Sequence, residues 1–222
     1  MPGGMRPERA TDAVLTALDQ QPTELGQVVA LLQAAGVPDA ADLPVGDGDR
    51  QLLALCRALT GRDVEVVLDC PACGVRNVAV LGPDTLPPDR PRSLWWGPGN
   101  GLRAPTYRDL DGLPADAAAA RDELLRRCVV GRPPRPVAAA DFDLVESSLT
   151  GSFQVACVDC GEELEAAVDV QRNALELLAG RLERFDWEVH LLAATYQWTL
   201  ATIERLPDER RHRLARLIDE GR

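Results

Sequence analysis

Two stretches decide the fold: VVLDCPACGVRNVAV, residues 66–80, and FQVACVDCGEELEAAVDV, residues 153–170. Each places two cysteines three positions apart, with a glycine directly after the second one (Gly74 and Gly161). The flanking residues alternate between apolar and polar, which is typical of strands with one buried face. Both stretches therefore predict a β-hairpin with its cysteine pair at the bend.

Two such turns that face each other supply four thiolates at about 2.3 Å from one ion, which is the ligand set of a closed structural zinc site. We expect Cys70, Cys73, Cys157 and Cys160 to be the ligands. The 83 residues between the pairs far exceed the usual zinc-ribbon spacer of about 15–20. Closure entropy grows only logarithmically with loop length, so the site is still allowed. We expect a ribbon built from distant halves, with a helix over 115–130 packed beside it.

Two other uses of the cysteine pairs stay open. Thioredoxin-like redox chemistry needs a thiolate at a helix N-terminus, whereas strands flank both pairs here. A catalytic zinc needs a vacant coordination position and a general base. The two histidines, His190 and His212, lie in predicted helices far from the cysteines, and we expect His190 to bond or pack against a neighbouring helix. The sequence shows no nucleophile–base pair or phosphate loop, so we predict a protein that is not an enzyme and has no small-molecule substrate.

The other two cysteines, Cys56 and Cys128, lie on apolar stripes of predicted helices and read as buried small hydrophobes.

Composition and charge limit the classes of partner that the protein can bind. The chain has 222 residues, 45% hydrophobic and 27% charged, and its formal net charge is −11. An acidic chain is a poor ligand for nucleic-acid phosphates, so nucleic acid is an unlikely partner. Arg210, Arg211 and Arg213 alternate with acids near the C-terminus, which indicates a solvated helix face. No secretory signal and no apolar run of 18 residues is evident, so we expect a cytoplasmic protein without a membrane span.

These patterns predict an α+β fold that is mostly helical, with a small four-cysteine zinc ribbon and a C-terminal helical region. The predicted segments are N-terminal helices over 1–62 (including 11–19 and 23–35), the first hairpin over 63–81, a proline-rich linker and inserted helix over 82–150, the second hairpin over 151–170, and C-terminal helices over 171–222. We expect residues 37–49 to be turn-rich and Gly82–Thr106 to be too broken for regular structure. A long helix from Val170 should break near Thr199, and a last helix should follow Pro207.

Exposed aromatic side chains could contact a partner. Trp95 and Trp96 lie in the proline-rich segment, where packing onto the domain and partner contact are both open. Trp187 falls on an apolar helical stripe, which favours the core. Tyr196 and Trp198 lie at the end of the long helix, where they could face a partner.

The order of these segments and one C-terminal sequence pattern are similar to those of a known protein family. The chain resembles the baseplate hub assembly chaperone family of T-even-type contractile phages and bacterial contractile injection systems, over roughly Thr23 to Ile218. The pattern EVHxLAxxYxWSxxEILxLPxxRRxxYLxLI is matched at Glu188, Val189, His190, Leu192, Ala193, Tyr196, Trp198, Ile203, Leu206, Pro207, Arg210, Arg211 and Ile218, and Leu214 stands where the pattern has tyrosine. Thr202 replaces the glutamate of a capping box begun by Thr199, and Ala215 is smaller than the usual residue there.

The resemblance implies a non-enzymatic factor that helps the hub or spike of a phage-tail-like baseplate assemble, with a hub or spike protein as its partner. The alternative, motivated by the four cysteines and the C-terminal arginines, is a zinc-ribbon protein that binds nucleic acid or acts in transcription.

Overall fold

The computed structural model describes residue 14 and residues 16–84, 91–145 and 148–221. It is α+β, as the sequence predicted, and mostly helical. The helices are α2 (Glu24–Ala34), the 3-10 helix η1 (Ala40–Asp42), α3 (Val45–Thr60), α4 (Tyr107–Leu110), α5 (Ala117–Cys128), α6 (Ala139–Val145), α7 (Val170–Tyr196), α8 (Leu200–Glu204) and α9 (Asp208–Glu220). The strands are β1 (Val64–Asp69), β2 (Arg76–Leu81), β3 (Ser93–Gly97), β4 (Asn100–Arg103), β5 (Val129–Val130), β6 (Gly151–Ala156) and β7 (Glu163–Val168). Residues 16–20 are also helical, and the rest of the helix predicted over 11–19 lies mainly outside the described residues.

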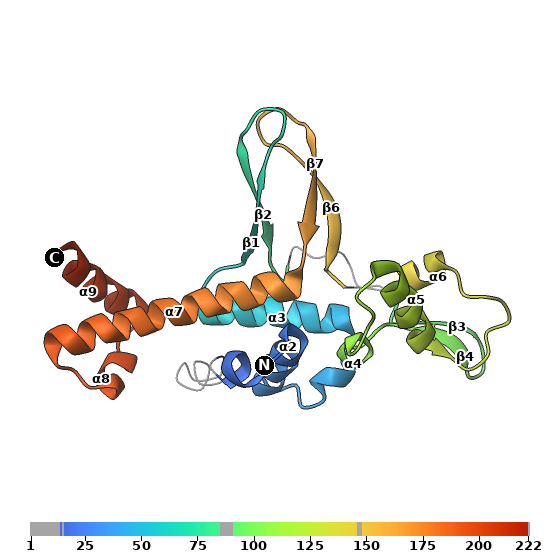
Figure 1. Ribbon diagram of the computed structural model, residues 1–222, viewed down its shortest axis with the longest axis horizontal. Helices are drawn as coiled ribbons and strands as arrows, with labels where there is room; N and C mark the ends of the chain where they lie inside the picture. Colours follow the sequence, from blue (N-terminus) through green and yellow to red (C-terminus); the bar gives the residue numbers. More distant parts are fainter. Residues whose placement is uncertain (1–13, 15, 85–90, 146–147, 222) are drawn as a thin grey trace.

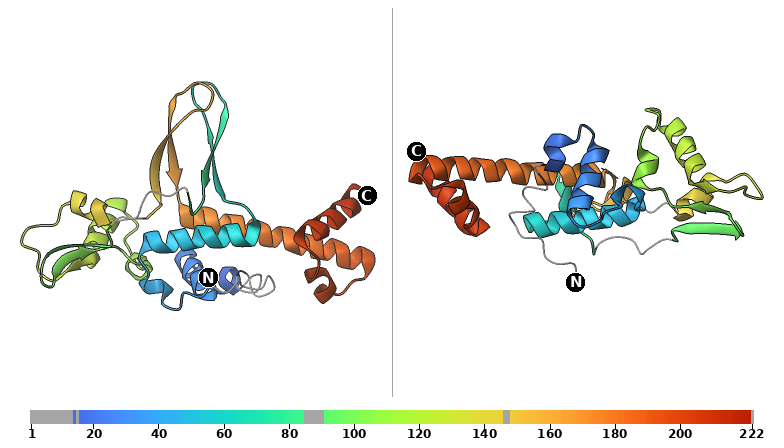
Figure 2. Two further views of the ribbon diagram at one scale, coloured as in Figure 1. Left: turned by 180° about the vertical axis from the view of Figure 1, so that it is seen from behind. Right: turned by 90° about the horizontal axis from the view of Figure 1, so that it is seen from below.

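The long helix α7 runs along the molecule, with α3 beside its first half and α2 below (Figures 1 and 2). Apolar stripes of these three helices meet at the base of both hairpins and form the main core. Its members include Val28, Leu31, Leu32, Leu52, Leu53, Cys56, Val64, Ala166, Val168, Ala174 and Leu178. Cys56 is therefore the small buried side chain that the sequence predicted, and burial raises the pKa of its thiol to about 12.

Helix α3 begins earlier than expected, at Val45, inside the segment predicted to be turn-rich. The Val45 N–H donates to the Pro105 carbonyl (2.9 Å), which anchors the first turn to a distant part of the chain. Gly48 lies against the ring of the buried Tyr107, and a Cβ at that position would lie 2.2 Å from a ring carbon. Tertiary contacts thus override the local preference of glycine and proline for turns.

A buried carboxylate joins four segments at this place. Asp49 of α3 accepts hydrogen bonds from the Tyr107 hydroxyl (3.1 Å), the Leu149 N–H (3.0 Å) and the Gln171 amide (3.3 Å). Burial raises the pKa of Asp49, while the hydrogen bonds from Leu149, Tyr107 and Gln171 act in the opposite direction. Because an unpaired buried carboxylate is costly, these donors fix how α4, the chain before β6 and α7 meet α3.

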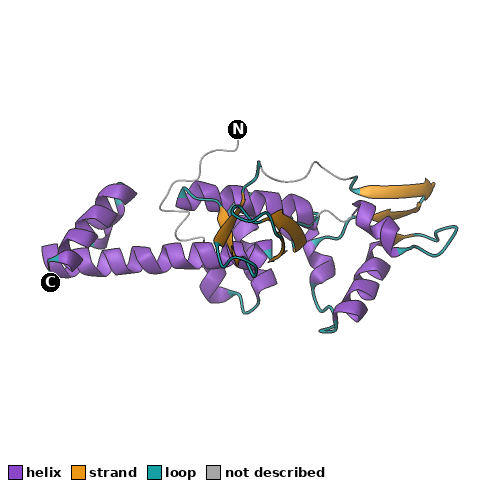
Figure 3. Ribbon diagram, turned by 90° about the horizontal axis from the view of Figure 1, so that it is seen from above, coloured by secondary structure: helices purple, strands orange, loops and turns teal. Residues whose placement is uncertain are grey.

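The two hairpins rise side by side from the helical body, and their tips meet (Figure 1). Both are antiparallel: β1 pairs with β2 from Val64↔Leu81 to Asp69↔Arg76, and β6 pairs with β7 from Gly151↔Val168 to Ala156↔Glu163. Figure 3 looks along them from above, onto the helices. Alternate residues of β1 and β7 are buried, so the prediction of half-buried strands is confirmed.

The segment between the hairpins differs from expectation. The proline-rich stretch predicted to be irregular contains the β3–β4 hairpin, because Gly97 (φ +156°) and Gly99 (φ +72°) supply the backbone conformations of a tight turn. Helix α5 does not pack beside the ribbon as predicted. It packs on β3, β4 and α6 through a separate small core built around Leu102, Cys128, Phe142 and Val145. These elements form an end module, residues 91–145, at the opposite end of the molecule from α8 and α9 (Figure 1).

The C-terminal helices fold back onto the far end of α7. The prediction of a break near Thr199 is confirmed: α7 ends at Tyr196, Gln197 adopts a left-handed conformation (φ 56°), and the unpredicted short helix α8 follows. Arg211 of α9, expected on a solvated face, is instead buried, and it donates to the buried Glu188 of α7 (2.7 Å). The histidine that bonds a neighbouring helix is His212, whose Nδ1 lies 2.9 Å from Glu188, whereas His190 is exposed.

We expect Gly48→Ala to lower the free energy of unfolding by about 1–3 kcal/mol, because the new methyl group would overlap the Tyr107 ring. Gly180→Ala is the matched control, since nothing lies within 4 Å of a Cβ at that position in α7. It should raise the free energy of unfolding by about 0.5–1 kcal/mol through helix propensity. Chemical denaturation of both variants measures the difference, and equal effects would contradict the close contact.

We expect Glu188→Gln to destabilise the packing of α9 on α7 by about 3 kcal/mol, because it leaves the buried Arg211 without its main counter-charge. Hydrogen exchange should then show lost protection in residues 208–220 and unchanged protection in α3. Glu220→Gln removes the exposed pair with Arg216 and should change little. Retained protection of α9 in Glu188→Gln would refute the role of the buried pair.

Candidate metal centre

Each cysteine pair lies in a knuckle, a tight turn closed by the same two backbone hydrogen bonds. In the first, the Cys70 N–H donates to the Val75 carbonyl (2.9 Å) and the Gly74 N–H donates to the Cys70 carbonyl (2.8 Å). The second knuckle repeats both bonds, from Cys157 to Glu162 (2.8 Å) and from Gly161 to Cys157 (3.0 Å). Gly74 (φ +74°) and Gly161 (φ +76°) have left-handed backbones, which explains why glycine follows each pair.

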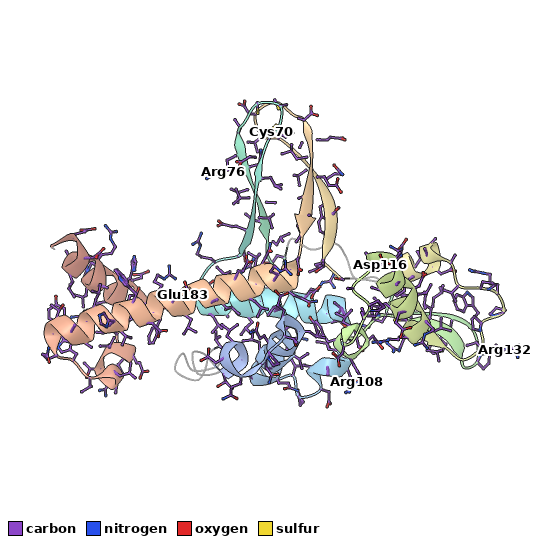
Figure 4. The ribbon with its side chains drawn as sticks, viewed as in Figure 1. Cys70, Arg76, Arg108, Asp116, Arg132 and Glu183 are labelled. Atoms are coloured by element: carbon purple, nitrogen blue, oxygen red, sulfur yellow. The ribbon has the colours of Figure 1, made fainter. Side chains whose placement is uncertain are left out.

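The structure brings the four predicted cysteines together at the tips of the hairpins (Figure 4). Their sulfur atoms all lie within 4.8 Å of one another, and none is in a disulfide. The shortest separations run between hairpins: 3.6 Å from Cys70 to Cys160 and 3.7 Å from Cys73 to Cys157. Four sulfurs at 2.3 Å from a tetrahedral ion lie about 3.8 Å apart. The cluster therefore has the size and donor set of a four-thiolate metal centre.

The surroundings of the sulfurs favour some thiolates more than others. The backbone N–H groups of Cys160 and Asp159 lower the pKa of Cys157 to about 6. The Val75 N–H also favours the Cys73 thiolate, but partial desolvation within the cluster and the other three sulfurs outweigh it and raise the pKa of Cys73 to about 12. Because four thiolates this close repel one another, a cation is what would keep all four deprotonated together.

An apolar layer lies directly below the sulfurs. Cys70, Cys157 and Leu164 are buried in one cluster, against which Leu68, Val75 and Val155 pack. Cys73 and Cys160 are exposed, so each knuckle offers one buried and one exposed sulfur. Leu68 and Val155 also pack against the main core, so this apolar layer connects the sulfur cluster to it.

Asn77 is a polar residue of this site that sequence reasoning did not single out. It is 5% exposed and lies in β2, the returning strand of the first hairpin. Its side chain accepts from the Val158 N–H (2.9 Å) in the second knuckle, and its Nδ2 lies 3.0 Å from the Val75 carbonyl oxygen and 3.6 Å from Cys157 Sγ. The sequence gives no signal for its burial, because alternation favours Val78 and Val80 as the inward residues of this strand, whereas both are exposed.

The two tryptophans in the end module have different environments. Trp96 packs against the small core, with the Arg135 guanidinium 5.6 Å from its ring centroid. Trp95 is 55% exposed, and its Nε1 donates to Ser93 (2.9 Å). Of this predicted partner-binding pair, only Trp95 presents its ring to solvent.

The other aromatic pair lies at the end of α7. Tyr196 and Trp198 stack with centroids 4.9 Å apart, and the left-handed Gln197 lies between them in sequence. Tyr196 is 41% exposed and Trp198 is half-buried. Trp187, which the sequence placed in the core, is 37% exposed, because α9 covers the adjacent face of α7 that carries Glu188.

Within the described part of the chain, no helix combines the length and apolar character needed to cross a membrane.

No protein-family model matches the sequence, and no curated protein and no solved structure is significantly similar to it. What the chain does is therefore inferred from its own residues and geometry.

Proposed function

We propose that Cys70, Cys73, Cys157 and Cys160 hold one structural zinc ion. The observation that supports this is the closure of four sulfurs, from segments 84 positions apart, into one cluster in which they all lie within 4.8 Å of one another. Tetrahedral four-sulfur sites suit zinc or iron, and a site with four protein ligands has no vacant position for a substrate. The ion would join the two hairpin tips and thereby fix two distant parts of the chain.

We further propose that this zinc-stapled scaffold is a non-enzymatic assembly factor for the hub or spike of a phage-tail-like contractile baseplate. The resemblance in the C-terminal pattern supports this, and the contacts of that pattern are consistent with a structural role. Two of its residues, Glu188 and Arg211, form the buried ion pair that holds α9 on α7. Two others, Tyr196 and Trp198, form the stacked aromatic pair, which suits contact with a protein.

Arg210 and Arg213 are exposed, but the placement of other arginines in this region favours this role over nucleic-acid binding. Arg211 is buried between Glu188 and Asp208, and Arg216 pairs with Glu220. Arg181 also pairs with Asp208. Charges engaged in this way are poorly placed to neutralise phosphates, and the chain carries a net charge of −11.

We expect Cys160→Ser to abolish binding of stoichiometric zinc and to lower the free energy of unfolding by at least about 2 kcal/mol, which corresponds to about 4–8 °C in Tm. Elemental analysis of the purified protein measures the metal and distinguishes zinc from iron, and calorimetry measures Tm. Cys128→Ala is the matched control: it removes a buried cysteine of the end module and should leave metal content unchanged. An unchanged metal content and Tm in Cys160→Ser would contradict the four-thiolate centre.

We expect the full chain, co-expressed with a hub protein of the same particle, to purify as a complex. Tyr196→Ala combined with Trp198→Ala should weaken that complex by about 2 kcal/mol or more, or about 30-fold in Kd. Trp95→Ala removes a more exposed aromatic ring at the other end of the molecule and should leave binding within about threefold. Failure of the wild-type chain to bind the hub, together with a shift of nucleic acid at low salt, would instead support the nucleic-acid alternative.

A further inference from the structure

The two knuckles share their cysteine and glycine positions and their backbone hydrogen bonds, but they differ at a buried position below the sulfurs. Counted from the first cysteine of each, the chain reads CPACGVRN from Cys70 to Asn77 and CVDCGEEL from Cys157 to Leu164. Asn77 and Leu164 thus occupy equivalent places, and each is 5% exposed beneath the sulfurs. One half of a repeated structure therefore has an amide where the other half has an aliphatic side chain.

The partners of Asn77 determine how its amide is oriented. The Val158 N–H can only donate, so it meets Oδ1 (2.9 Å). Nδ2 then faces two acceptors, the Val75 carbonyl (3.0 Å) and the Cys157 sulfur (3.6 Å). One side chain of the first hairpin therefore bonds both the backbone and a ligand of the second knuckle.

These bonds hold Cys157 and Val158, the part of the second knuckle whose position determines where its sulfurs point. Val158 lies directly after Cys157, so the bond to its N–H fixes the turn that aims the second pair of sulfurs. An N–H donor to sulfur also stabilises the thiolate, the form that binds metal. Leu164, in the equivalent place, makes neither bond and packs against Cys70 and Cys157.

We propose that Asn77 is a positioning residue of the metal centre, which holds the second knuckle against the first hairpin and orients Cys157 before the ion binds. This inference rests on the proposed four-thiolate centre. Asn77 makes the tip partly preformed without metal, so the ion binds more tightly and leaves more slowly than it would between two independent hairpins. Outer-shell partners of metal ligands contribute about 10- to 100-fold to affinity in other proteins.

Asn77→Leu tests this role, because it installs the residue that the second knuckle already has at the equivalent position. If Asn77 only filled space, the variant would be neutral or more stable, since leucine has no buried polar atoms to satisfy. We expect it instead to bind zinc roughly 10- to 100-fold more weakly, in competition with a chromogenic chelator on the full chain. Asn77→Asp keeps an acceptor for Val158 but places a carboxylate beside the thiolates, so its affinity should fall at least as far.

Asn100→Leu is the matched control, since Asn100 also bridges two segments, accepting from the Arg132 N–H (2.8 Å) in the end module. Its zinc affinity should equal that of the wild type. Substitution with Co²⁺ gives a second readout: the sulfur-to-cobalt absorption of Asn77→Leu should persist, because all four ligands remain, but chelator should remove the ion faster. This combination separates a positioning role from loss of a ligand or of the fold.

The outcomes separate a failure of the Asn77 proposal from a failure of the proposed metal centre. If the wild-type protein binds no ion, both proposals are wrong. If the wild type binds one ion and Asn77→Leu binds it with the same affinity and release rate, only the proposed role of Asn77 is wrong. Should Asn77→Leu fail to fold, Asn77→Asp decides, and zinc binding within twofold of wild type would then overturn the proposal.

Discussion

The arrangement of four sulfurs at the hairpin tips is the constraint on which the projection formed by the two hairpins (β1–β2 and β6–β7) depends. A two-stranded hairpin is at best marginally stable alone. The main core fixes the bases of the two hairpins through residues such as Val64 and Val168, while the cysteine cluster, the apolar layer around Leu164 and the hydrogen bonds of Asn77 lie at the tips. An ion at the sulfurs would therefore act at the point where the protein's own packing is weakest, which is where a metal ligand set adds most to rigidity.

The hairpins could be predicted because their signals are local. Period-2 alternation identifies the buried faces of β1 and β7, and glycine after each pair marks the left-handed turn, so the cluster followed from two short stretches despite their separation. In β2 the alternation misleads, because Val78 and Val80 are exposed and Asn77 is buried. Longer-range features could not be read this way. The apolar stripe of α5 shows that one face of this helix is buried, but it does not show which element covers that face. In the structure α5 packs on the other elements of the end module rather than on the ribbon. Glycine often marks the end of a helix, but here Gly97 belongs to a hairpin turn. Gly48 lies inside α3, because the ring of the distant Tyr107 occupies the space where a side chain would be.

Buried polar residues were the least predictable part of the site and of the fold. Asp49, Asn77 and Glu188 are each nearly inaccessible, and each is satisfied by partners more than twenty positions away. A polar residue on an otherwise apolar face is visible in the sequence, but its partner is not. For Glu188 and Arg211 a pattern did mark both residues, yet only the folded chain shows that they pair. The three residues lie where separate elements meet, so each fixes an orientation that apolar packing alone would leave loose.

In the proposed role, α7 is the element that makes one scaffold from these parts. Its first turns belong to the main core below the hairpins, and its last turns carry the C-terminal helices and the stacked Tyr196 and Trp198. A continuous helix transmits orientation along its length, so the metal-tipped projection and the aromatic end would be held in a set relation. An assembly factor needs that property, since it must present separate surfaces to a partner in one fixed geometry. A binder of a single small ligand would gain nothing from it, and this contrast is the physical reason for preferring the assembly role.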